Sequence, residues 1–82
     1  MRIRIAKTAL KEARKAPVEI IIKLIEATAR YAENRNAAVD VKAMQGEDNV
    51  FRIRVRDWRL IFTIEGETLT ITKIGPRGSL YR

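Results

Sequence analysis

The chain has 82 residues, which leaves room for one domain with a single thin hydrophobic core. It contains no cysteine and no histidine, which excludes disulfides, thiolate nucleophiles, sulfur-ligated zinc and the commonest general base. We therefore expect neither a metal nor a cofactor. Seventeen Lys and Arg against ten Asp and Glu give a net charge of +7. That balance favours a nucleic acid, a membrane surface or an acidic protein as the partner.

The first part of the chain predicts one strand and two helices. Residues 1–6 alternate between apolar and basic side chains, as in a short strand. Thr8 is placed to cap a first helix that runs through Lys15, and Pro17 suits the first position of a second helix ending near Asn34. The expected apolar stripe of the second helix is Ile21, Ile22, Ile25, Ala29 and Ala32, widened by Ile20, Leu24 and Tyr31.

The second part predicts three strands, after a polar, turn-rich stretch over residues 35–49. The strands cover roughly 50–56, 58–65 and 68–74, with turns at 56–57 and 65–67. The order β-α-α-β-β-β indicates an α+β fold, with an antiparallel sheet of about four strands and a helical hairpin on one face. Residues 1–82 form a single domain in this interpretation. With no apolar run of transmembrane length and no signal-peptide core, we expect a cytoplasmic protein.

The most informative segment is the alternating run at residues 51–56. Phe51, Ile53 and Val55 can enter the core while the arginines between them line the opposite face. Side chains two apart on a strand stand roughly 6.6 Å apart, which suits the phosphates of a single nucleic-acid strand. The alternative interpretation is an ordinary solvated sheet face. Trp58 and Phe62 fit the core better than a base-stacking role.

The segment after the last strand admits several interpretations. In Gly75-Pro-Arg-Gly78, a glycine-flanked Arg77 can mark a backbone that approaches a phosphate, or an ordinary turn. The Gly-x-x-Gly spacing is that of a KH loop, but a KH loop joins two helices and this one leaves a strand. Tyr81 can act in chemistry or cover the edge of the sheet.

Several segments together carry a resemblance to the RelE/ParE toxin superfamily of bacterial toxin–antitoxin pairs. They are Ala6-Lys-Thr-Ala-Leu-Lys11, Lys42-Ala-Met-Gln-Gly46, Phe51-Arg-Ile-Arg-Val55, Asp57-Trp-Arg-Leu-Ile-Phe62, Ile74-Gly-Pro-Arg77 and Leu80-Tyr-Arg82. The resemblance spans nearly the whole chain and rests on order and spacing. It implies the same β-α-α-β-β-β fold. The RelE branch cleaves messenger RNA in the ribosomal A site, and the ParE branch inhibits DNA gyrase.

The resemblance also implies a site. The family's site positions resemble Arg52, Arg54, Arg59, Arg77 and Tyr81. We expect Arg54, Arg59, Arg77 and Tyr81 to be catalytic, and Arg52 to bind RNA together with Lys42, Arg56 and Arg82. Two features depart from the family. Both basic residues of the first strand after the helices are Arg where Lys is common, and the interval from Arg77 to Tyr81 is shorter than in some members.

RNA carries its own nucleophile, the 2′-OH, so a toxin of the RelE kind aligns it, assists proton transfer and stabilises charge. In our hypothesis Arg59 and Arg77 contact the scissile phosphate, because fixed Arg donors match the extra negative charge of the transition state. Arg52 and Arg54 position the backbone and offset leaving-group charge. Tyr81 serves as general base, since neighbouring cations lower a phenol pKa from its usual value of about 10.

The same resemblance implies partners. These are the ribosome with its messenger RNA and a cognate antitoxin, whose acidic segment wraps the toxin in a hetero-oligomer. No membrane partner is expected. The alternative function is a ParE-like toxin that inhibits DNA gyrase by binding, without ribonuclease activity.

Overall fold

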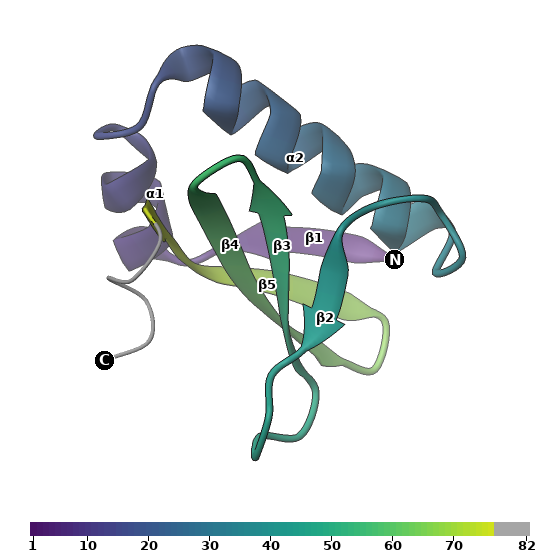
Figure 1. Ribbon diagram of the computed structural model, residues 1–82. Coiled ribbons are helices and arrows are strands. Elements are labelled where there is room, and N and C mark those ends of the chain that lie inside the picture. Colours follow the sequence, from purple (N-terminus) through teal and green to yellow (C-terminus); the bar gives the residue numbers. More distant parts are fainter. Residues whose placement is uncertain (77–82) are drawn as a thin grey trace.

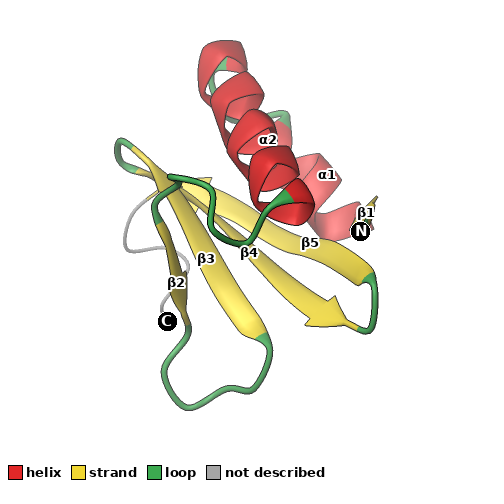
Figure 2. Cartoon of the chain, turned by 90° about the vertical axis from the view of Figure 1, so that its right-hand side faces the viewer, coloured by secondary structure: helices red, strands yellow, loops and turns green. Residues whose placement is uncertain are grey.

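The computed structural model describes residues 1–76, as one sheet with two helices packed on it (Figure 1). The strands are β1 (Arg2–Ile5), β2 (Val41–Ala43), β3 (Val50–Val55), β4 (Trp58–Glu65) and β5 (Thr68–Pro76). The helices are α1 (Lys7–Ala13) and α2 (Val18–Glu33). Both helices lie on the same side of the sheet (Figure 2), which confirms the α+β class with a helical hairpin on one face.

The sheet has five strands in the order β1-β5-β4-β3-β2. Strands β3, β4 and β5 form the predicted antiparallel meander, with Phe51 opposite Phe62. Two features go beyond the prediction. Strand β1 pairs with β5 in parallel, and β2 adds an edge strand within the stretch expected to be turns. A strand of three residues is too short for apolar alternation to reveal it.

Helix α1 begins at Lys7 rather than behind a Thr8 cap, so that prediction is wrong. The N–H of Ala6 donates to the carbonyl oxygen of Ile71 at 2.9 Å, and Ala6 is the N-cap without a side-chain bond. The chain thus stays in register with the sheet until the helix starts. The Thr8 hydroxyl donates instead to the carbonyl oxygen of Thr72 at 3.5 Å.

Helix α2 starts directly after Pro17. The three residues expected to widen its stripe are buried, and Ile21, Ile25 and Ala32 of the central stripe are partly buried against the core. The buried side chains are Ile20, Leu24, Thr28 and Tyr31. Ile22, placed in the predicted stripe, is 53% exposed. A threonine can occupy the stripe because its hydroxyl donates to the carbonyl oxygen of Leu24 at 2.8 Å, which satisfies a buried polar group. No helix within residues 1–76 has the length and apolar content needed to cross a membrane.

The core between sheet and helices contains a cluster of aromatic rings. Phe62 is fully buried, and its ring stacks on Phe51 with centroids 5.4 Å apart. Tyr31 of α2 approaches Phe62 with centroids 5.7 Å apart. Trp58 is partly buried against the same core. The prediction that Trp58 and Phe62 belong to the core is therefore confirmed.

A β-bulge in strand β5 changes which side chains face the helices. Ile61 pairs with Lys73 while Phe62 pairs with Ile71, so Thr72 has no partner residue in β4. The Thr72 hydroxyl donates to the carbonyl oxygen of Ile61 at 3.3 Å. The extra residue shifts the alternation by one position. As a result, Ile71 and Ile74 are both buried, and Lys73 shares the helix-free face of the sheet with Ile61.

Candidate nucleic-acid interface

The helix-free face of the sheet carries a row of arginines near the β3–β4 turn. Arg54 of β3 lies opposite Arg59 of β4, and Arg59 lies opposite Gly75 of β5. Arg59 is only 8% exposed, whereas Arg54 is exposed. Arg59 is therefore paired on one side with a residue that carries a long basic side chain and on the other with a glycine, which carries none.

The tip of the hairpin orients Arg54. The Nε of Arg54 donates to the carbonyl oxygen of Arg56 at 3.0 Å. Arg56 is the first of the two turn residues and has a φ of +56°. This bond leaves both terminal nitrogens of the Arg54 guanidinium available for an external acceptor.

A second row of side chains lies on the same face, two residues further from the β3–β4 turn along each of these strands. In register across four strands it contains Lys42, Arg52, Ile61 and Lys73. Asp40 precedes β2 and approaches Arg52, with Oδ1 3.5 Å from the arginine Nη1. The Arg52 side chain is 12% exposed, so its position is set by packing as well as by this carboxylate.

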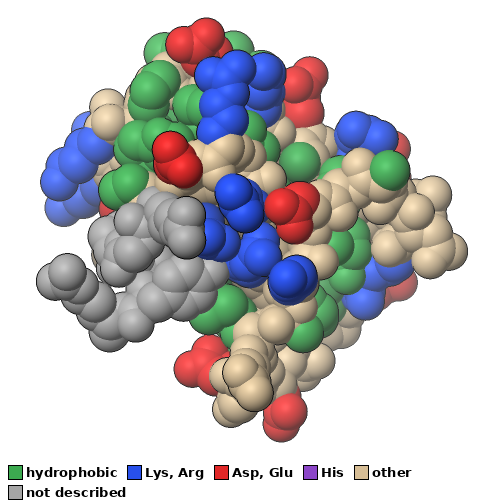
Figure 3. Space-filling model, viewed as in Figure 1, with side chains coloured by type: hydrophobic (Ala, Val, Ile, Leu, Met, Phe, Trp, Pro, Cys, Tyr) green, Lys and Arg blue, Asp and Glu red, His purple; other side chains and the backbone are tan. Residues whose placement is uncertain are grey.

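Together, Lys42, Arg52, Arg54, Arg59 and Lys73 form what we call the cationic surface. Lys and Arg side chains gather at the centre of this face in Figure 3. Like charges on adjacent strands repel one another, and Asp40 neutralises only part of them. An arginine fork binds phosphate oxygens in bidentate geometry, so a polyanion relieves the repulsion. The arrangement suits a backbone of linked phosphates.

The structure brings together four of the residues singled out from sequence: Lys42, Arg52, Arg54 and Arg59. Arg56 adjoins them at the hairpin tip. Arg77, Tyr81 and Arg82 lie outside the described residues. The sequence interpretation missed Lys73, although the change from Leu69 and Ile71 to Ile74 at apolar positions signals the bulge that turns Lys73 to this face.

Comparison with known proteins identifies the family. The sequence profile described as ParE toxin of type II toxin-antitoxin system, parDE, matches residues 3–81. The toxin RelE3 of Methanocaldococcus jannaschii is 31% identical over 84 residues, covering 99% of this chain and 96% of that protein. The chain belongs to the RelE/ParE superfamily of type II toxins. It is a RelE-type toxin of a toxin–antitoxin system.

Solved structures agree with this assignment. The RelB–RelE antitoxin–toxin complex from Methanococcus jannaschii contains a chain that is 30% identical to the protein described here, with a TM-score of 0.79. The match covers 95% of this chain and 94% of that one. YafQ from E. coli strain BL21(DE3) is 19% identical, with a TM-score of 0.79 and full coverage of both chains. At that identity the second likeness establishes the fold alone.

Proposed function

We propose that this toxin is a ribosome-dependent endoribonuclease that cleaves messenger RNA in the A site by attack of the substrate 2′-OH. The observation that carries the proposal is the cationic surface, where Arg residues from β3 and β4 converge in register on the helix-free face. The chain is also 31% identical to a protein named as the toxin RelE3, which supports the RelE branch. The single domain over residues 1–82 would supply all the toxin's own residues of the site.

The proposed roles follow from the chemistry of the side chains. Arg59 and Arg77 bind the scissile phosphate and stabilise the charge that develops on its oxygens. The partly enclosed position of Arg59 supports this role, since donors in a water-poor site act more strongly than donors in bulk water. Arg54 and Arg52 position the RNA backbone and offset the negative charge of the leaving group, and Tyr81 accepts the 2′-OH proton.

The remaining basic residues extend the RNA path. Lys42, Arg56 and Arg82 contact the backbone on either side of the cut. Arginine is a poor proton donor, because it stays protonated. In this proposal the leaving 5′ oxygen therefore takes its proton from the ribosome, the substrate or water, and the ribosome completes the site.

We further propose a cognate antitoxin as the partner that silences the toxin in a hetero-oligomer. A relative at 30% identity was solved as a RelB–RelE complex. The cationic surface calls for an acidic segment in the antitoxin. Co-expression with the antitoxin should block cleavage, and undiminished cleavage by the purified complex would refute this part.

The decisive experiment adds purified toxin to ribosomes stalled on a short message and maps the 5′ ends by primer extension. We expect a cut at the A-site codon with the wild type and no cut with Arg77→Ala. Arg30→Ala is the matched control, because it removes the same charge from an exposed position on α2. Full cutting by Arg77→Ala would refute the role of that residue.

The second candidate is gyrase inhibition, which the match to the ParE profile over residues 3–81 favours. In that case, the wild type leaves stalled messages intact and inhibits DNA supercoiling by gyrase. Arg77→Ala would then retain most of the inhibition. Running both assays on the same preparation separates the two functions.

A further inference from the structure

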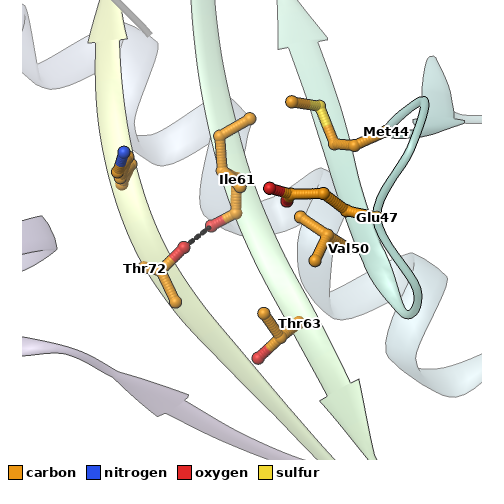
Figure 4. A pocket seen from close by; sticks show the side chains of 7 residues that line it. Met44, Glu47, Val50, Ile61, Thr63 and Thr72 are labelled. Carbon is orange, nitrogen blue, oxygen red and sulfur yellow. Dashed lines mark hydrogen bonds between the residues drawn. The ribbon is translucent and has the colours of Figure 1, made fainter. Parts of the chain in front are cut away.

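A pocket of about 290 Å³ adjoins the cationic surface on the helix-free face. It lies between strands β4 and β5 and the loop that joins β2 to β3. Its apolar walls are the side chains of Met44, Val50 and Ile61. In Figure 4, Met44 and Glu47 extend from the loop toward Ile61, with Val50 beside Glu47. The pocket is close to the lower limit of roughly 300 Å³ for small-molecule sites, so it suits one flat ring.

The loop that carries Glu47 has a defined conformation. The N–H of Met44 donates to the carbonyl oxygen of Val50 at 2.8 Å and closes the loop at its base. The N–H of Glu47 donates to the carbonyl oxygen of Met44 at 3.4 Å. Gly46 has a φ of +82°, a conformation that glycine adopts without steric cost. The backbone at Glu47 is therefore fixed by a local turn, which places its side chain on the lining of the pocket.

The polar groups of the pocket combine one anion, one cation and two hydroxyls. Glu47 offers two acceptor oxygens and Lys73 offers donors. Within the described residues 1–76, no ion pair joins Glu47 to Lys73, so both remain available to a ligand. Thr63 and Thr72 add hydroxyls, and the Thr72 hydroxyl is oriented by its bond to the Ile61 carbonyl (Figure 4).

The pocket is continuous with the phosphate-binding groups. Ile61, on the pocket wall, lies in register with both Arg52 and Lys73. Arg59 is two positions back along β4, a distance of roughly 6.6 Å. A ligand with an anionic backbone and a flat ring can therefore reach the arginines and the pocket together. A nucleotide within an RNA strand has this form.

We propose that this pocket binds one unstacked base of the RNA and prefers guanine, a specificity that rests on the proposed ribonuclease function. The Watson–Crick edge of guanine presents two adjacent N–H donors and one carbonyl acceptor. Two carboxylate oxygens of Glu47 accept from the donors while the Lys73 ammonium donates to the carbonyl. Uracil matches worst, because two carbonyls flank its single N–H. The Met44 thioether packs on the ring, a contact favourable for sulfur and aromatic groups.

The test uses the stalled-ribosome assay with messages that differ only in the A-site codon. At each position of that codon, all four bases are compared. The wild type should cut best with guanine at one codon position and worst with uracil there. Glu47→Gln should reduce that ratio by about 5- to 150-fold, the discrimination that a bidentate base contact typically provides. Asp48→Asn is the matched control, because it removes the same charge from the next loop residue, which does not line the pocket. It should retain the wild-type ratio.

The outcomes separate the inference from the function on which it rests. No cut at any codon would overturn both. Cutting without a guanine preference, or with one that Glu47→Gln leaves unchanged, would overturn the inference alone. The same holds if Glu47→Gln keeps the preference and weakens antitoxin binding, because the pocket would then belong to a protein partner. Thermal unfolding at the wild-type temperature shows that Glu47→Gln is folded, as expected for an exposed loop residue.

Discussion

The Glu12 carboxylate of α1 accepts a hydrogen bond from the backbone N–H of Ile74, with Oε1 2.9 Å from the nitrogen. Strand β1 pairs with β5 only over residues 68–71, so it offers no carbonyl to this later part of β5. The side chain of Glu12 takes the place of a neighbouring strand. It ties α1 to β5 just before Gly75, which lies opposite Arg59 on the cationic surface.

Glu12→Ala should lower the free energy of unfolding by about 1–3 kcal/mol, because it leaves a partly buried N–H without an acceptor. In a domain of this size the melting temperature should fall by roughly 4–8 °C per kcal/mol. Glu12→Gln keeps an acceptor oxygen, so its free energy of unfolding should fall by less than half as much as that of Glu12→Ala. Thermal unfolding followed by circular dichroism measures both. Equal losses in the two variants would show that charge, rather than the hydrogen bond, matters at this position.

The order of elements was predictable because each long element carries its own pattern. Strand β4 alternates Leu60, Phe62 and Ile64 toward the core, and all three are buried. Helix α2 is long enough for apolar periodicity to fix its bounds within a residue. The exposure of Ile22 was not predictable, since Ile22 is as apolar as Ile20 and only the packed sheet decides which one is buried.

The remaining differences arise from tertiary structure. The parallel pairing of Ile3 with Leu69 depends on how the helices return the chain to the sheet, which local pattern does not encode. Of the site, the alternating arginines of β3 and their neighbour Arg59 were predictable because strand parity fixes their face. Lys73 and the pocket at Glu47 were not predicted, because they depend on a bulge and on a loop conformation.

The aromatic cluster should dominate stability. Phe62→Ala removes a fully buried ring that contacts Phe51 and Tyr31, and should cost about 3–5 kcal/mol. That is a large part of the roughly 5–15 kcal/mol that stabilises a typical domain. Phe62→Leu keeps most of the apolar volume and should cost about 1.5 kcal/mol or less. Urea unfolding gives both values, and a similar midpoint for the two variants would contradict this view of the core.

The hairpin tip stores local strain. Arg56 has a φ of +56°, where a side chain costs about 1–2 kcal/mol, while glycine costs about 0.5–1 kcal/mol in chain entropy. Arg56→Gly should therefore raise the free energy of unfolding by about 0.5–1 kcal/mol. Arg56→Ala removes the same charge but keeps Cβ, so it should give no such gain. Urea unfolding measures the free energy of unfolding of both variants. An equal increase in the two would mean that the stabilisation comes from relief of charge repulsion with Arg54.

Arg59 tests whether the cationic surface acts through geometry or through charge alone. Arg59→Ala should lower the rate of A-site cleavage about 10²–10³-fold, the usual loss when a donor to the transition state is removed. Arg59→Lys keeps the charge but loses the planar fork, so it should also be slow while binding RNA nearly as well. Single-turnover cleavage on stalled ribosomes measures the rate. The affinity for a single-stranded RNA at several salt concentrations measures how far the charge of residue 59 contributes to binding.

The salt dependence separates the two variants. Arg59→Ala should reduce the slope of log affinity against log salt by about 0.7, the value for one phosphate contact on a single strand, and Arg59→Lys should leave it unchanged. Arg30→Ala on α2 controls for net charge and should alter neither rate nor slope. A wild-type rate for Arg59→Lys would mean that a point charge suffices. A wild-type rate for Arg59→Ala would remove this residue from the site altogether.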